Sequence, residues 1–180
     1  NFSNNFLISM PHLNDSIFSK SLIYLCDHNS LGAMGIIINK PMPSENVQNI
    51  LTEMGLEQLK PRVDIYFGGP VQIGMGMILH DHKYETKGTL NISKSISLSS
   101  NTDIINDISN GNGPNEFKFA LGYAGWDKGQ LEKEIENGDW LLVPSNYDLI
   151  FNTPSSKMLK KLKSLINIDI NHFSGGLSGL

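Results

Sequence analysis

The stretch SLIYLCDHNSLGAMGIIINKP, residues 21–41, decides the fold of this chain. It predicts a β-hairpin. Residues 21–28 are rich in β-branched and aromatic side chains, residues 29–32 have turn composition, and residues 33–39 are apolar again before Pro41. Both faces of the two strands carry apolar residues. Because a strand that is apolar on both faces is usually buried, we expect the hairpin to lie in the middle of a sheet.

A turn over residues 29–32 fixes which residues of the hairpin face each other. The expected pairs are His28 with Ala33, Cys26 with Gly35 and Tyr24 with Ile37. Because side chains alternate along a strand, Tyr24, Cys26 and His28 then share one face of the sheet.

Strands and helices are expected in mixed order along the rest of the chain. Periodicity and turn residues predict strands over residues 6–9, 64–67, 76–80, 89–93, 95–98, 116–124 and 140–144. Helical spacing and capping residues predict helices over residues 44–54, 102–108, 126–137 and 154–166. The length of 180 residues suits one domain spanning residues 1–180.

Composition narrows the functional classes. The chain is 39% hydrophobic with a mean hydropathy of -0.17, and it contains no apolar run long enough to span a membrane. We see no signal peptide, and a single cysteine excludes an intramolecular disulfide, so we expect a cytoplasmic location. A net charge of -4 and a single arginine argue against direct binding of nucleic acid.

Several sequence blocks together carry a family resemblance. They are YLCDHN (24–29), GAMGIIINKP (32–41), FGGP (67–70), ILH (78–80), ALGYAGWDKGQLEKEI (120–135) and Trp140. In this order and spacing they resemble the YqgE/AlgH family of bacterial proteins. The resemblance implies an α+β fold in which a forked mixed β-sheet curls into a pseudo-barrel flanked by helices.

The resemblance implies little about activity, because the family is largely uncharacterised. One member is named for a proposed role as a transcriptional regulator of alginate synthesis. This sequence shows no helix-turn-helix with a basic recognition helix and no zinc-finger spacing. Any regulatory role is therefore expected to act through a protein partner or a small ligand.

Two residues of the hairpin are weak candidates for catalysis. An imidazole at hydrogen-bond distance stabilises a thiolate, so Cys26 and His28 could form a thiol and base pair. Free cysteine is also commonly buried, and no oxyanion hole or third orienting group is recognisable. His80 and His82 have the spacing of metal ligands but lack further ligands, so we expect no metal and no cofactor, and His80 is interpreted as a hydrogen-bonded sheet residue.

Polar and glycine residues within the family blocks suit a ligand-binding cleft better than a catalytic centre. The predicted cleft comprises Asn29, Asn39, Lys40, Gly68, Gly69, Tyr123, Trp126 and Gln130. The sequence thus favours a non-catalytic regulatory module that binds a small ligand or a protein. The alternative is a thiol-dependent or hydrolytic enzyme acting on a small molecule near Cys26 and His28.

Overall fold

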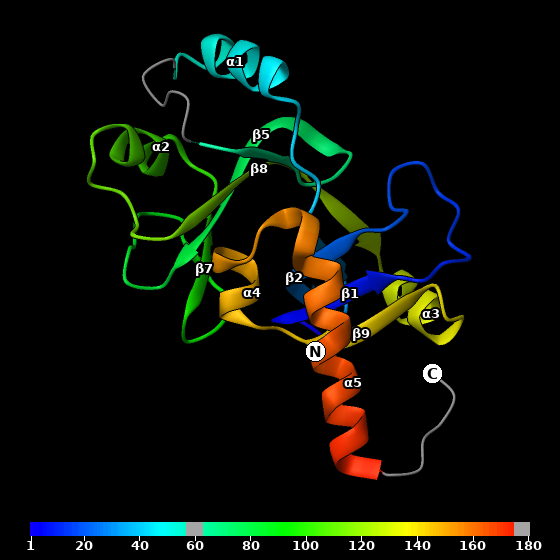
Figure 1. The fold of residues 1–180 in the computed structure, drawn as a ribbon. Helices are drawn as coiled ribbons and strands as arrows, with labels where there is room; N and C mark the ends of the chain where they lie inside the picture. The colour runs from blue at the N-terminus through cyan, green and yellow to red at the C-terminus, as the bar shows by residue number, and fades with distance from the viewer. Residues whose placement is uncertain (57–62, 175–180) are drawn as a thin grey trace.

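One curved sheet forms the body of the protein, as the computed structural model shows for residues 1–56 and 63–174, with side chains up to residue 167 (Figure 1). Within these residues the strands run in the order β6-β7-β5-β8-β3-β2-β1-β9, and β4 pairs with β8 beside this path. Their bounds are β1 Asn5–Ser9, β2 Leu22–Asn29, β3 Gly32–Ile37, β4 Ile65–Phe67, β5 Val71–Asp81, β6 Leu90–Asn91, β7 Ile96–Ser99, β8 Phe117–Asp127 and β9 Trp140–Pro144. The expected hairpin, β2 with β3, lies in the middle of this order.

The sheet forks at β8. Along one edge of β8, residues 119–121 pair with β4 in parallel and residues 124–127 pair with β3 in antiparallel. The other edge of β8 pairs with β5. A forked mixed sheet in an α+β fold was expected from the family resemblance, and this prediction is confirmed.

Two glycines allow the chain segments to approach closely at the fork. Gly122 has φ +74°, and a Cβ there would lie 2.4 Å from the carbonyl oxygen of Gly69. Gly69 has φ +152°, and its Cβ would lie 2.1 Å from the carbonyl carbon of Tyr123. Only glycine accepts both the backbone conformation and the contact. The segment after β4 therefore lies inside the fork, where the Gly68 amide donates to Leu121 O (2.8 Å).

A β-bulge at Cys26 changes the register of the hairpin. His28 faces Ala33 as predicted, but the register shifts between Leu25 and Asp27. The predicted pairs Cys26 with Gly35 and Tyr24 with Ile37 are wrong: Leu25 faces Gly35 and Tyr24 faces Ile36. An extra residue in one strand reverses the facing of every side chain beyond it. Tyr24 and Cys26 thus share a core cluster, whereas His28 lies on the opposite face.

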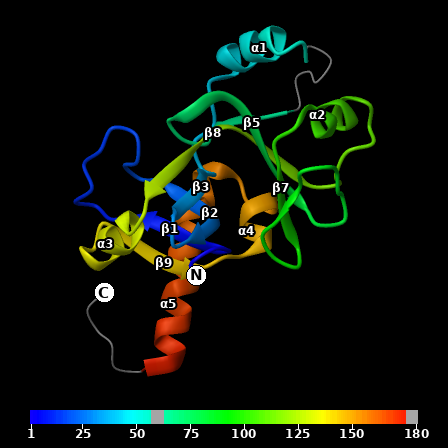
Figure 2. The same ribbon diagram turned by 180° about the vertical axis from the view of Figure 1, so that it is seen from behind.

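Helices cover the sheet on different sides (Figures 1 and 2). Their bounds are α1 Ser44–Glu53, α2 Thr102–Ser109, α3 Gln130–Glu136, α4 Tyr147–Asn152 and α5 Met158–Ser174. Helices α4 and α5 pack on the face that carries Tyr24, α3 packs on the opposite face, and α1 and α2 pack against β4, β5 and β8. None of the described helices combines the length and apolar character needed to span a membrane.

Most predicted elements match the structure to within a few residues. The strand predicted over residues 76–80 is longer, because β5 begins at Val71, and the helix predicted over residues 154–166 begins as a 3-10 turn over Ser155–Lys157 and continues as α5 to Ser174. The helix expected from Trp126 is wrong at its start, because Trp126 and Asp127 continue β8 and α3 begins only after Gly129, which has φ +74°. Helix α4 was not predicted, although Asn146 caps it by accepting a hydrogen bond from the Leu149 amide (2.9 Å).

Candidate functional site

An open groove lies between the tip of the β2–β3 hairpin and the start of β5. We call it the hairpin groove, and its volume is about 620 Å³. It is lined by Asp27, Asn29, Leu31, Gly32, Ala33, Met34, Val71, Gln72, Met75, Met77, Ser100, Tyr123, Gly125, Trp126 and Asp127. Residues between Val71 and Gly76 are left out of the β5–β8 pairing, and this irregularity brings β5 side chains toward the hairpin.

Apolar side chains at this end of the molecule are unusually exposed. Leu31, at the hairpin tip, is 82% exposed, and Ile73, in the irregular part of β5, is 51% exposed. The groove is also lined by three methionines, Met34, Met75 and Met77. Exposed apolar side chains beside a groove are typical of surfaces that bind another molecule, and methionine adapts its shape to varied partners.

The charged residues that line the hairpin groove are all acidic. Asp27 and Asp127 line it, and no lysine, arginine or histidine is among its lining residues in the described part of the chain. The bulge at Cys26 turns Asp27 toward the groove, since the facing of the side chains reverses there. The groove therefore combines an apolar lining with negative charge.

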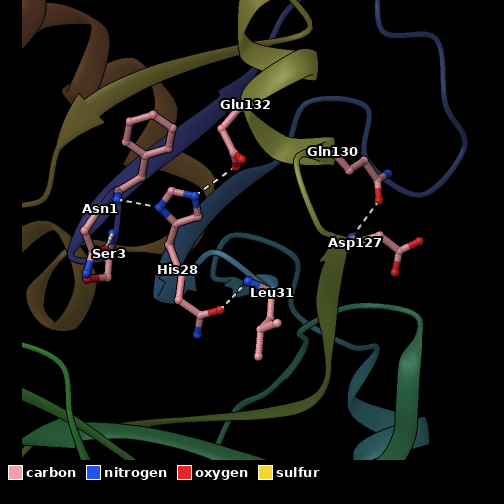
Figure 3. A network of polar contacts seen from close by, with 9 residues as sticks. Asn1, Ser3, His28, Leu31, Asp127, Gln130 and Glu132 are labelled. Carbon is pink, nitrogen blue, oxygen red and sulfur yellow. Dashed lines mark hydrogen bonds and ion pairs between the residues drawn. The ribbon is translucent and has the colours of Figure 1, made fainter.

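The residues of the predicted cleft lie in separate parts of the structure. Asn29, Tyr123 and Trp126 do line the hairpin groove. Asn29 also holds the hairpin turn, where its Oδ1 accepts from the Leu31 amide (2.8 Å; Figure 3). Gly68 and Gly69 instead lie inside the fork, against Gly122 and Tyr123.

Two other predicted cleft residues lie beyond the far end of β3. Strand β3 has six residues, so its ends are about 20 Å apart. There, Asn39 Oδ1 accepts from the Leu22 amide (2.9 Å), and the Lys40 ammonium donates to Ile17 O. Burial lowers the pKa of Lys40. Asn39 and Lys40 thus hold the chain before β2 and cannot share a ligand with Asn29.

Gln130 caps the turn that leads into α3 (Figure 3). Its Oε1 accepts from the Asp127 amide (2.9 Å), and its Nε2 donates to Glu134 Oε2 (2.8 Å). Glu134 Oε1 in turn accepts from the indole nitrogens of Trp126 (3.2 Å) and Trp140 (3.1 Å). Gln130 and Glu134 therefore fix the position of Trp126, which is only 7% exposed.

His28 and Cys26 do not form a pair. Nδ1 of His28 accepts from the Phe2 amide (2.9 Å), so Nε2 carries the proton that it donates to Glu132 Oε1 (2.9 Å; Figure 3). This hydrogen bond lowers the pKa of Glu132. The buried Cys26 thiol donates to Tyr24 O (3.6 Å), and burial raises its pKa. Thiol and imidazole lie on opposite faces of the sheet, so the geometry provides no activated thiolate.

His80 is a hydrogen-bonded sheet residue, as the sequence indicated. Its Nδ1 donates to Asp81 O (2.8 Å), and its Nε2 accepts from the Ser99 hydroxyl (2.8 Å). Burial lowers the pKa of His80. Both ring nitrogens are therefore used within the protein.

Sequence reasoning missed a second cavity, of about 350 Å³, between β4, β8 and α4. We call it the lysine cavity, because Lys118 of β8 lines it while being only 7% exposed. The Nζ of Lys118 donates to Ile38 O (3.1 Å) and lies 3.9 Å from the centroid of the Tyr66 ring. The signal was present as FKFA, a lysine between two phenylalanines in a strand that is otherwise apolar.

The comparisons with known proteins agree on one family. A family model described as AlgH-like matches residues 6–171. The chain belongs to the AlgH-like family. It is 43% identical to a UPF0301 protein of Marinomonas sp. (strain MWYL1) over 96% of this chain and 93% of that protein. A UPF0301 protein of Coxiella burnetii is 39% identical, again over 96% of this chain and 93% of the relative.

Solved structures of similar proteins share the AlgH-like fold. The solution structure of the AlgH protein from Pseudomonas aeruginosa matches with a TM-score of 0.76 and 32% identity, covering 98% of this chain and 95% of that one. The crystal structure of a protein from Corynebacterium diphtheriae matches with a TM-score of 0.68 and 20% identity, covering 87% and 82%. The second likeness concerns the fold alone.

Proposed function

We propose that this protein is a non-catalytic cytoplasmic binding module with a regulatory role, and that the hairpin groove binds an apolar segment of a partner protein that also carries lysine or arginine. The observation that carries the proposal is the groove lining, which combines the exposed Leu31 and several less exposed apolar side chains with two aspartates, and which includes no basic residue from the described part of the chain. Apolar anchors supply binding free energy, and charge complementarity selects the partner.

The chemistry of the groove supports a protein segment as the occupant. The groove lies open beside the exposed Leu31 and Ile73, so an extended or helical segment can reach it without local unfolding. Its methionines suit side chains of varied shape. The net charge of -4 disfavours nucleic acid as the regulatory partner.

The enzymatic alternative near Cys26 and His28 gains no support from this geometry. The two ring nitrogens of His28 are engaged in hydrogen bonds, Nδ1 with the Phe2 amide and Nε2 with Glu132. The Cys26 thiol is buried on the other face of the sheet. A nucleophilic mechanism needs a base within hydrogen-bond reach of the thiol.

Selection from a random peptide library tests the proposed function. We expect selected peptides to combine apolar residues with lysine or arginine, and to bind more weakly as the salt concentration rises. Leu31→Glu should weaken binding at least about tenfold, since it removes an apolar contact and adds negative charge.

Leu90→Glu is the matched control, because Leu90 is also exposed but lies in β6, away from the groove. The proposal is overturned if no peptide is selected, if the selected peptides are acidic, or if Leu31→Glu and Leu90→Glu bind equally well.

A further inference from the structure

The lysine cavity gathers charged and polar groups from two neighbouring strands. Tyr66 lies in β4 and Lys118 lies in β8, and Asp64 and Glu116 come two residues earlier, just before these strands begin. The pairing of Tyr66 with Ala120 sets the two segments beside each other, and all four residues line the cavity.

The amine of Lys118 is only partly satisfied by the protein. An ammonium group has three N–H donors, and Ile38 O is its single hydrogen-bond acceptor among the described residues. The Tyr66 ring face contributes a further attraction for the cation. Burial nevertheless lowers the pKa of Lys118 to about 8, against 10.5 for an exposed lysine. A substantial fraction of the amine is therefore neutral near physiological pH, as a nucleophile requires.

A carboxyl group with an unused oxygen lies in the same cavity. Glu116 Oε2 is buried and has no hydrogen-bond partner among the described residues. Buried polar atoms are usually paired, so an unpaired carboxylate oxygen needs an explanation. Burial and the charge of Glu116 raise the pKa of the nearby Tyr147 to about 12, which keeps that phenol protonated. A side-chain hydrogen bond between Tyr147 and Glu116 contributes to this shift, so the carboxylate is partly engaged and only its buried Oε2 remains open to take a proton.

We propose that Lys118 forms a Schiff base with a small aldehyde or ketone that enters the lysine cavity, and that Glu116 transfers the proton. The neutral Nζ attacks the carbonyl carbon, a C–N bond forms, and the π electron pair moves to oxygen. Glu116 carries one proton from the nitrogen to this oxygen, which gives a carbinolamine with a hydroxyl group. It then carries the second proton from the nitrogen to the hydroxyl group, which leaves as water while the nitrogen lone pair forms the C=N bond. The balance is one amine and one carbonyl compound giving one imine and one water.

This site is independent of the hairpin groove. Glu116 lies just before β8, and Lys118 is the second residue of that strand. The groove is lined by the other end of β8, beyond Gly122. A small molecule fits the volume of about 350 Å³, which is at the lower end of ligand pockets.

Reductive trapping tests the proposal on the full chain. The protein is incubated with glycolaldehyde and cyanoborohydride, which reduces the imine to a stable secondary amine, and labelled lysines are quantified by peptide mass spectrometry. Below pH 8 the lowered pKa gives Lys118 about 300 times more neutral amine than a surface lysine. Allowing for restricted access and lower intrinsic reactivity, we expect labelling at least about tenfold faster at Lys118 than at the exposed Lys94.

The pH profile and a variant sharpen the result. Labelling of Lys118 should level off above about pH 8, the pH at which half of its amine is neutral. Glu116→Gln should slow labelling of Lys118 at least about fivefold and leave Lys94 unchanged. In urea both lysines should react at one rate, because the fold no longer distinguishes them.

Two outcomes overturn the proposal. The first is labelling of Lys118 in the folded protein that is no faster than labelling of Lys94. The second is labelling of Lys118 that is unaffected by Glu116→Gln, which removes the assigned role of the carboxyl group.

Discussion

The hairpin groove and the lysine cavity depart from ordinary protein surfaces and cores in opposite ways. In the groove, apolar side chains such as Leu31 are exposed to water, whereas in the cavity a charged side chain, Lys118, is withdrawn from it. Both arrangements cost free energy in the isolated protein. One strand, β8, borders two regions of opposite character because the fork at Gly122 directs its halves to different neighbours.

The largest effect is expected where the two regions meet. Gly69→Ala should lower the free energy of unfolding by more than about 4 kcal/mol, since the new Cβ would overlap the Tyr123 backbone and φ +152° is unfavourable for alanine. Both the groove and the cavity should be lost together, as urea denaturation and circular dichroism would show.

Gly74→Ala is the matched control for the fork. A Cβ at Gly74 meets nothing within 4 Å, so we expect a change within about 0.5 kcal/mol. Equal stability of the two variants would show that the fork does not need close backbone contact.

The next largest effect concerns the buried charge of the cavity. The pKa of Lys118 is about 8 in the folded chain and near 10.5 when unfolded, so the unfolded state binds more protons between these values. Stability contributed by this group therefore rises with pH across that window and is lost as pH falls through it. Relative to Lys118→Met, the wild-type free energy of unfolding should rise by about 3 kcal/mol between pH 8 and 10.5.

Urea denaturation at several pH values measures this difference. Lys94→Met serves as the control for replacing a lysine by methionine, because Lys94 is exposed. Parallel curves for wild type and Lys118→Met would contradict the burial of a titrating amine.

The smallest effect concerns the exposed apolar groove. Leu31→Ser should change the free energy of unfolding by less than about 0.5 kcal/mol, because the side chain contacts mostly water. Leu25→Ala, in the same hairpin but fully buried, should cost about 3 kcal/mol. A loss above about 1 kcal/mol for Leu31→Ser would mean that Leu31 stabilises the fold and is not available to a partner.

Local sequence patterns predicted the elements of this fold better than its register. The hairpin, α1, α2 and β9 follow from periodicity and turn residues, since these features act over a few neighbouring positions. The bulge at Cys26 carries no local signal such as glycine, so the sequence pattern did not indicate it. One unrecognised extra residue was enough to place His28 on the wrong face.

Only some residues of the predicted cleft lie together in the structure, and the reason is geometric. Polar and glycine residues from separate family blocks were expected to meet in one cleft, but Asn29 and Lys40 flank a strand that separates them by its full length. Lys118 was overlooked because a single lysine in a strand is usually exposed, and its burial depends on Tyr66 and Ile38 from distant parts of the chain.

The pairing of β1 with β9 has a consequence for synthesis of the protein. Ser9 of β1 faces Trp140 of β9, so nearly the whole length between these strands must leave the ribosome before they can meet. Until then one edge of β1 presents unpaired amide and carbonyl groups, which other nascent strands could bind. Folding of this sheet is therefore completed late in synthesis.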